Sequence, residues 1–311
     1  MKVLVTGATG LVGSELVPFL TKKGYDVFRL TRSKPQEVHD IVWDPAHNQL
    51  PKARLEGIDT VVHLAGENIA GKRWNSQVKE ELRKSRVEGT KLICQTMAQL
   101  EKRPKTLICA SAIGFYGSRG SELLNETSAA GQGFLAELCC DWEAACEPAR
   151  VAGIRVVNLR IGVVLSTKGG GLAKMLTPFR LGVGGVVGTG NQYWSWIEID
   201  DVVGAINHCI SHESLSGPVN ATAPCPVTNY DFTKTLGRVL GRPTVFPMPG
   251  FVAKIALGEM ANDLLLGSAR VMPNRLSGSG YQFQYPSLEP ALKHLLHPDS
   301  PSLHHASSNP H

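Results

Sequence analysis

Three glycines near the start of the chain have a spacing that suits phosphate binding. Gly7, Gly10 and Gly13 give G-x-x-G-x-x-G within MKVLVTGATGLVG, between an apolar segment and an amphipathic one. Gly7 permits a tight turn, Gly10 lets a ligand approach the backbone, and Gly13 allows a helix to pack closely on a sheet. The free amides and dipole of that helix attract anions. The pattern predicts a dinucleotide site rather than an ordinary glycine turn, with contacts from Gly7, Thr9, Gly10, Leu11, Val12 and Gly13.

The end of the second apolar segment, residues 25–31, predicts which dinucleotide is bound. Proteins that prefer NAD place Asp or Glu there to bond the ribose 2′-hydroxyl. Here the residues are Thr31, Arg32, Ser33 and Lys34, with no acid among them. A guanidinium can bind a 2′-phosphate through two parallel hydrogen bonds. Thr31 and Arg32 therefore favour NADP(H) as the cofactor, the alternative being that Arg32 is a solvated charge.

Alternating apolar and amphipathic segments predict the elements that must position these residues. Strands are expected at residues 2–6, 25–31, 40–43, 59–64, 106–111 and 155–159, and helices at 11–24, 76–102 and 133–150. Such alternation is typical of an α/β protein with a Rossmann-type, doubly wound parallel sheet. Ligands of these sheets bind at the carboxyl ends of the strands.

The alternation stops after Arg160, and this change indicates a division of the chain. We expect a Rossmann domain over residues 1–225, with substrate-side insertions from about 165 that include a glycine-rich stretch at 169–190. A smaller α/β C-terminal portion that binds and caps the substrate is expected over 226–296. Residues 297–311 are low in complexity and are expected to form a disordered tail.

Composition narrows the classes of function. The chain has 311 residues, a formal net charge of +5 and scattered Lys and Arg residues, which argues against a nucleic-acid partner. No apolar segment is long enough to span a membrane. The 7 Cys residues and the absence of a leader predict a cytoplasmic protein with reduced thiols. No metal site is expected, because Cys139, Cys140 and Cys146 lack a further ligand at suitable spacing. A homodimer is left open.

Several motifs together resemble the extended short-chain dehydrogenase/reductase superfamily. They are GATGLVG at 7–13, HLAG at 63–66, SAIGFYG at 111–117 and WIEIDDV at 196–202. AGENIAGKRW at 65–74, KSR at 84–86, LRIGVVL at 159–165 and MLTPFRLGVGG at 175–185 resemble one atypical subgroup more closely. That subgroup is the NADP-binding "epimerase family protein" group of the NAD-dependent epimerase/dehydratase superfamily.

The resemblance implies further cofactor contacts. They would come from Leu64, Ala65 and Gly66, from Glu81 and Arg86, and from Arg160, in addition to Thr31 and Arg32. Arg86 and Arg160 could each neutralise a phosphate, whereas Glu81 would have to accept from a hydroxyl or orient an arginine. The alternatives are a surface charge pair for Glu81 and Arg86 and a strand-end charge for Arg160.

The usual proton-transfer residues of the superfamily are missing. Working members use a Tyr, a Lys one helical turn later, and a Ser on the fifth strand as acid–base groups. With Glu143 as the anchor of the alignment, those positions fall on Leu135, Cys139 and Ala112. Ser111 lies one residue early, and Tyr116 follows nearby. The catalytic residues are therefore unknown, with Ser111 and Tyr116 as candidates.

Candidate substrate contacts come from loops and strand ends. Arg73, Arg180 and Trp196 are predicted, with Lys72, Trp74 and Trp194 in the same regions; for the tryptophans, core packing is the alternative. Glu67, Lys72, Arg73 and Glu198 could also substitute for the missing proton-transfer residues. Together these observations predict an NADP(H)-binding oxidoreductase or epimerase-like enzyme that acts on a small substrate. The alternative is a non-catalytic NADP(H)-sensing or interaction protein.

Overall fold

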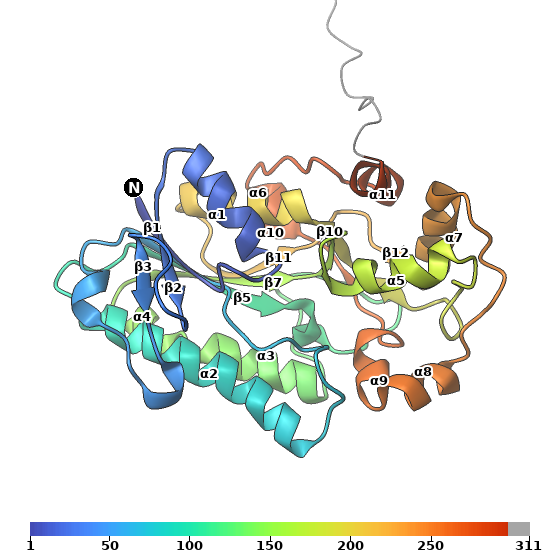
Figure 1. Cartoon of the computed structure of the whole chain (residues 1–311), viewed down its shortest axis with the longest axis horizontal. Coiled ribbons are helices and arrows are strands. Elements are labelled where there is room, and N and C mark those ends of the chain that lie inside the picture. Colours follow the sequence, from blue (N-terminus) through green and yellow to red (C-terminus); the bar gives the residue numbers. More distant parts are fainter. Residues whose placement is uncertain (298–311) are drawn as a thin grey trace, which may run out of the picture.

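The centre of the protein is a parallel sheet. The computed structural model describes residues 1–297, so the predicted tail lies, apart from His297, outside the described residues. The seven strands have the order β11-β7-β5-β4-β1-β2-β3, and every pairing is parallel (Figure 1). Their bounds are β1 Lys2–Thr6, β2 Asp26–Thr31, β3 Asp40–Val42, β4 Thr60–His63, β5 Thr106–Ala112, β7 Arg155–Ile161 and β11 Gly217–Ala221. This order confirms the predicted doubly wound, Rossmann-type sheet.

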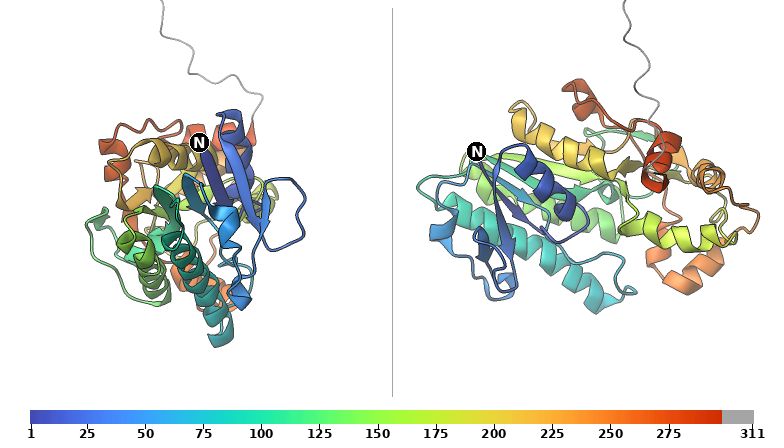
Figure 2. Two further views of the ribbon diagram at one scale, coloured as in Figure 1. Left: turned by 90° about the vertical axis from the view of Figure 1, so that its left-hand side faces the viewer. Right: turned by 45° about the horizontal axis from the view of Figure 1, so that its top comes forward.

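Both faces of the sheet are covered, which explains why its strands are continuous apolar runs. Leu4 of β1 packs in one core cluster, whereas Val3 and Val5 pack in another, because successive side chains point to opposite faces. Helices α2 (Ser76–Ala98), α3 (Phe134–Ala144) and α4 (Glu147–Val151) cover the first face. Helices α1 (Gly13–Lys22) and α6 (Ile199–Ser211) cover the other, as Figures 1 and 2 show.

The helix predicted over residues 133–150 is interrupted. It forms α3 and α4, with Ala145 and Cys146 between them and Pro148 at the start of α4. Proline has no amide hydrogen to donate to the preceding turn, so the helix ends and restarts there. Pro18, by contrast, lies within α1, which continues past it.

The rest of the chain packs beyond the carboxyl ends of β5 and β7. It contains three two-stranded pairings: β6 (Leu123–Leu124) with β13 (Arg270–Val271), β8 (Val163–Leu165) with β10 (Trp196–Glu198), and β9 (Tyr193–Trp194) with β12 (Val227–Thr228). Its helices are α5 Gly170–Arg180, α7 Asn229–Leu240, α8 Gly250–Leu257, α9 Met260–Leu264 and α11 Leu288–Leu296. Helix α10, Asn274–Gly278, packs instead on β11, in the same core cluster as α1 and α6. The short 3₁₀ turns of the chain are η1 Pro45–His47, η2 Lys52–Leu55 and η3 Ile113–Tyr116.

A separate core around Trp194, Trp196 and Phe232 holds together much of the part of the chain that follows β7. Within residues 1–297, no helix is both long and apolar enough to cross a bilayer.

Candidate nucleotide-binding site

The predicted cofactor residues leave the sheet side by side. Thr6 of β1 is opposite Leu30 of β2 on one side and His63 of β4 on the other. The chain therefore reaches Gly7, Thr31 and Leu64 at the same level, at the carboxyl edge of the sheet. The strand order reverses at β1, and this is the place where doubly wound sheets bind dinucleotides.

The glycine turn requires glycine for measurable reasons. Gly7 has φ of +66°, and a Cβ there would lie 2.9 Å from the amide nitrogen of Ala65. A Cβ on Gly13 would overlap the carbonyl oxygen of Gly7, so the first turn of α1 packs directly on the loop. A Cβ on Gly10 would meet only the Gly7 oxygen, at 3.2 Å, which leaves its outer side open to a ligand. A side chain at Gly7 or Gly13 would therefore collide with the backbone of this turn or of the segment after β4.

A buried hydrogen-bond chain fixes the end of β4 against this turn. The hydroxyl of Thr6 accepts from the amides of Leu64 and Ala65, both at 3.1 Å. Its own hydrogen must then go to Nδ1 of His63, 2.7 Å away. The other ring nitrogen of His63 consequently donates to Thr90, at 3.0 Å. The chain holds His63 as a neutral imidazole and places Leu64 and Ala65 beside Gly7.

His63 predicts a specific pH dependence of stability. Burial lowers the pKa of His63 from 6.5 to about 4. The unfolded chain therefore binds more protons than the folded protein between these values, and stability falls as the pH decreases through that range. We expect His63 to account for a loss of about 2 kcal/mol between pH 7 and pH 5. Urea unfolding of His63→Gln should show a flatter pH dependence than unfolding of the wild type; equal slopes in the two proteins would refute the assignment.

Two arginines flank the expected adenosine end of the site. Arg32 follows β2, is 70% exposed and donates to Oε1 of Glu67 at 3.0 Å. Arg86 of α2 donates to the carbonyl of Glu67 at 3.0 Å and lies against Gly66, where a Cβ would be 3.3 Å from its Cζ. Arg32, Gly66 and Arg86 are thus brought together around the segment that follows β4. Both arginines therefore contact Glu67, Arg32 through its carboxylate and Arg86 through its carbonyl.

Three other predicted residues, Glu81, Arg73 and Arg180, have different surroundings. The half-buried Glu81 carboxylate accepts from Lys72 and Gln77, each at 3.2 Å. Arg73 lies beside the backbone of Gly258, and Arg180 is exposed at the end of α5. The three do not form one cluster with the glycine turn.

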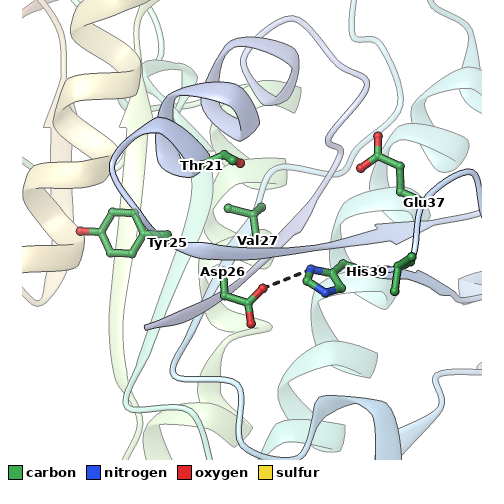
Figure 3. A pocket seen from close by; sticks show the side chains of 7 residues that line it. Thr21, Tyr25, Asp26, Val27, Glu37 and His39 are labelled. Carbon is green, nitrogen blue, oxygen red and sulfur yellow. Dashed lines mark ion pairs between the residues drawn. The ribbon is translucent and has the colours of Figure 1, made fainter.

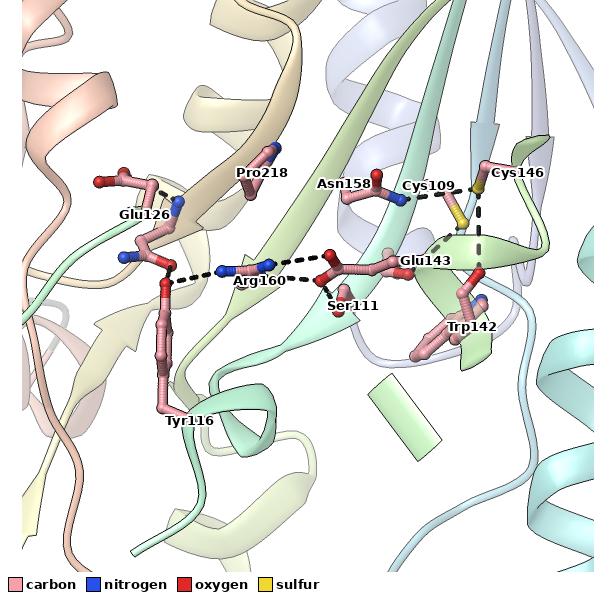
Figure 4. Close-up of polar contacts among 12 residues, drawn as sticks. Cys109, Ser111, Tyr116, Glu126, Trp142, Glu143, Cys146, Asn158, Arg160 and Pro218 are labelled. Atoms are coloured by element: carbon pink, nitrogen blue, oxygen red, sulfur yellow. Dashed lines mark hydrogen bonds and ion pairs between the residues drawn. The ribbon is translucent and has the colours of Figure 1, made fainter. Parts of the chain in front are cut away.

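A polar network occupies the carboxyl ends of β5 and β7 (Figure 4). Glu143 of α3 accepts two hydrogen bonds from Arg160, at 2.8 and 2.9 Å, and one from the hydroxyl of Ser111, at 2.7 Å. Arg160 also donates to the Tyr116 hydroxyl at 3.0 Å, and its guanidinium lies 3.4 Å from the centre of the Phe115 ring. The Glu143 carboxylate therefore links the Arg160 side chain of β7 to the Ser111 side chain of β5.

The network continues away from the strand ends through residues that the sequence did not single out. The Tyr116 hydroxyl donates to the side-chain oxygen of Asn220 at 2.8 Å. The backbone amide of Asn220 donates to the Glu126 carboxylate at 3.1 Å. Tyr116 is completely buried, and burial raises its pKa. This candidate catalytic residue therefore anchors η3 to β11 in the structure.

The structure places Leu135 and Cys139 beside the turn that follows β5. A Cβ on Gly114 would lie 3.2 Å from the Leu135 side chain and 3.8 Å from the Cys139 sulfur. Leu135, Cys139 and Glu143 are four residues apart and share one face of α3. Burial, followed by the charge of Glu143, raises the pKa of Cys139 to about 11, so its thiol stays protonated at neutral pH. That spacing was the signal that could have identified Glu143 as a site residue.

Two of the predicted site residues are buried in the structure. The Arg160 side chain is only 4% exposed and is bound by Glu143, because α3 brings a carboxylate to the end of β7. It belongs to the internal network rather than to an open phosphate site. Trp196 is fully buried, and its ring nitrogen donates to the carbonyl of Cys225 at 3.2 Å. The burial of Trp196 leaves no surface for a substrate, because β10 lies inside the core around Trp194, Trp196 and Phe232.

A hollow elsewhere in the sheet is unrelated to these residues. It is lined by Thr21, Tyr25, Asp26, Glu37 and His39 among others, and includes the Asp26–His39 pair at 3.1 Å (Figure 3). It lies at the amino end of β2, opposite the carboxyl edge where the glycine turn is found. The hollow therefore does not extend the predicted site.

Comparisons with known proteins agree with this geometry. Residues 3–221 match the NAD dependent epimerase/dehydratase family, and residues 248–295 match a domain of unknown function, DUF1731. An epimerase family protein of Mycobacterium bovis is 41% identical over 290 residues, which cover 93% of this chain and 96% of that protein. Human epimerase family protein SDR39U1 is 36% identical over 301 residues, covering 95% of this chain and 100% of that protein.

Two solved structures are similar over most of this chain. Human SDR39U1 isoform 2, solved with NADPH, has a TM-score of 0.86 and 35% identity, covering 95% of this chain and 99% of that one. A nucleoside-diphosphate sugar epimerase from Corynebacterium glutamicum has a TM-score of 0.80 and 38% identity, covering 95% of this chain and 58% of that one. The glycine turn, the strand order and these similarities show that the chain belongs to the NAD-dependent epimerase/dehydratase family.

Proposed function

We propose that this protein binds NADP(H) at the carboxyl edge of β1, β2 and β4. The pyrophosphate would lie on the glycine turn, against the N-terminus of α1. The observation that carries the choice of the phosphorylated cofactor is Arg32, which follows β2 in a stretch without Asp or Glu and can exchange the exposed carboxylate of Glu67 for a 2′-phosphate. Thr31, Leu64, Ala65, Gly66 and Arg86 would complete the adenosine end. The NADPH in the human relative's structure supports the same choice.

We further propose an oxidoreductase or epimerase-like enzyme that acts on a small substrate. NADP(H) would supply the hydride chemistry, while the protein orients the substrate and handles its proton. Ser111 and Glu143 are the proposed proton-handling pair, because their 2.7 Å contact lies at the end of β5, beside the positions where Leu135 and Cys139 cannot exchange protons. Residues 226–296 would cap the substrate, with Arg73 and Arg180 as candidate contacts for an anionic group.

The second candidate function is a non-catalytic NADP(H) sensor. Leu135 and the protonated thiol of Cys139 favour it, because they occupy the positions of the usual Tyr and Lys. A sensor would bind NADPH without consuming it.

A turnover screen distinguishes the two functions. The purified protein with NADPH is offered a panel of carbonyl and sugar-nucleotide compounds, and the loss of NADPH absorbance is followed. An enzyme that uses Ser111 should lose about 100-fold or more in kcat in Ser111→Ala, with an unchanged Kd for NADPH, while exposed Ser121→Ala stays active. NADPH binding without turnover across the panel would instead support the sensor.

A further inference from the structure

Three side chains that suit metal binding meet between α11 and the start of α6. Glu198 ends β10, Asp200 lies in the first turn of α6, and His294 comes from α11. One ligand atom of each lies within 4.8 Å of those of the other two. His294 Nε2 is 3.3 Å from Asp200 Oδ2. His294 meets Glu198 and Asp200 only in the folded protein, because α11 is far from β10 in the sequence.

The Glu198 carboxylate is the feature that points to a ligand. Its side chain is fully buried, and Oε2 accepts from the amide of Asp200 at 2.6 Å. Within residues 1–297, Oε1 has no hydrogen-bond partner. A buried carboxylate oxygen without a donor is costly, and such groups are normally paired or bound to a metal.

The neighbouring charged groups do not supply the missing partner. Lys168 is paired with Glu15 at 2.6 Å. Asp201 is a further acid whose oxygens accept from Tyr281 and from the amides of Gln284 and Tyr285. The site therefore gathers three acidic side chains beside one imidazole, and a bound cation would favour their charged forms.

The imidazole of His294 is oriented by an aromatic neighbour. Its ring stacks on Tyr285, with centroids 4.6 Å apart and an angle of 21° between the planes. This arrangement leaves Nε2 directed at Asp200. Two carboxylates and one imidazole match the donors preferred by Zn²⁺, and they also suit Mn²⁺.

We propose that Glu198, Asp200 and His294 bind a divalent transition-metal ion, Zn²⁺ or Mn²⁺. The ion would neutralise the carboxylates of Glu198 and Asp200. It would also join α11 to the end of β10 and the start of α6. Around such an ion the donor atoms must close to about 3.3 Å from one another, a movement open to the partly exposed side chains of Asp200 and His294. This role is structural, and it does not depend on the proposed redox function.

Metal titration of the full-length protein tests this site. After treatment with a chelator, the protein is titrated calorimetrically with Zn²⁺ and with Mn²⁺, and bound metal is counted by mass spectrometry. We expect one equivalent in the wild type and a rise of about 5 °C in Tm at a metal concentration 100 times Kd. His294→Ala and Asp200→Asn should each weaken binding at least about 10-fold and abolish the rise.

Two controls keep the test decisive. His304 and His305 could also bind metal. The double variant His304→Ala, His305→Ala must therefore still bind one equivalent of metal and show the rise in Tm. Glu198→Gln gives a second readout, since it should lose metal binding while remaining folded at neutral pH. The proposal is overturned if the wild type binds no metal, if His294→Ala keeps full affinity, or if the tail variant loses the bound ion.

Discussion

NADPH binding is expected to weaken about 100-fold in Gly13→Ala. The added methyl group would overlap the Gly7 carbonyl oxygen, so the first turn of α1 must move away from the phosphate turn. Overpacking of this kind costs about 2 to 3 kcal/mol, and the displaced amides would no longer point at the pyrophosphate. Calorimetric titration with NADPH measures the loss directly.

Gly10→Ala separates binding from folding at the same turn. Its methyl group meets only the Gly7 oxygen, at 3.2 Å, so the fold should persist while the methyl occupies the surface of the expected phosphate. Gly278→Ala serves as the matched control, because nothing lies within 4 Å of that Cβ. Unchanged NADPH affinity in Gly10→Ala would show that the pyrophosphate does not bind at this turn.

Glu143→Gln is expected to lower the free energy of unfolding by about 3 kcal/mol. Glu143 is 13% exposed and Arg160 only 4%, so loss of the carboxylate leaves a guanidinium buried without its counter-charge. The same change removes the strongest acceptor of the Ser111 hydroxyl. Urea unfolding measures the stability, and the turnover screen measures the effect on activity.

The surrounding residues provide a control and a rescue for this variant. Glu137→Gln lies on the same helix but is 68% exposed, with its nearest arginine contact at 3.8 Å, so it should change stability by less than about 0.5 kcal/mol. Adding Arg160→Met to Glu143→Gln should restore part of the loss, because the unpaired charge is then removed. If Glu143→Gln and Glu137→Gln are equally stable, the network does not hold the strand ends as described.

Local sequence predicted six of the seven strands of the central sheet, whereas β11, Gly217–Ala221, was not predicted as a strand. The strand expected at residues 2–6 is β1 to the residue, and the strand expected at 106–111 differs from β5 by one residue. Buried parallel strands read as unbroken apolar runs, and the turns between them carry glycine or proline. The motif spacing also located the glycine turn, since every contact that defines it lies close in the sequence or follows from the strand order.

The polar interior could not be predicted in the same way. Glu143 and Arg160 are paired only because α3 crosses the end of β7, and Arg160 alone reads as a free strand-end charge. His63 needs Thr90 from the middle of α2, and Asp200 meets His294 through α11. These contacts depend on tertiary packing, which periodicity and spacing do not specify.

Cofactor preference in wild type and Arg32→Glu tests the central claim most directly. Calorimetric titration with NADPH and NADH should show a clear preference for NADPH in the wild type. Loss of the guanidinium and addition of a like charge beside the 2′-phosphate should remove that preference, by about 100-fold in the ratio of the two Kd values. A variant that keeps the wild-type ratio, or a wild type that binds neither nucleotide, would contradict the account.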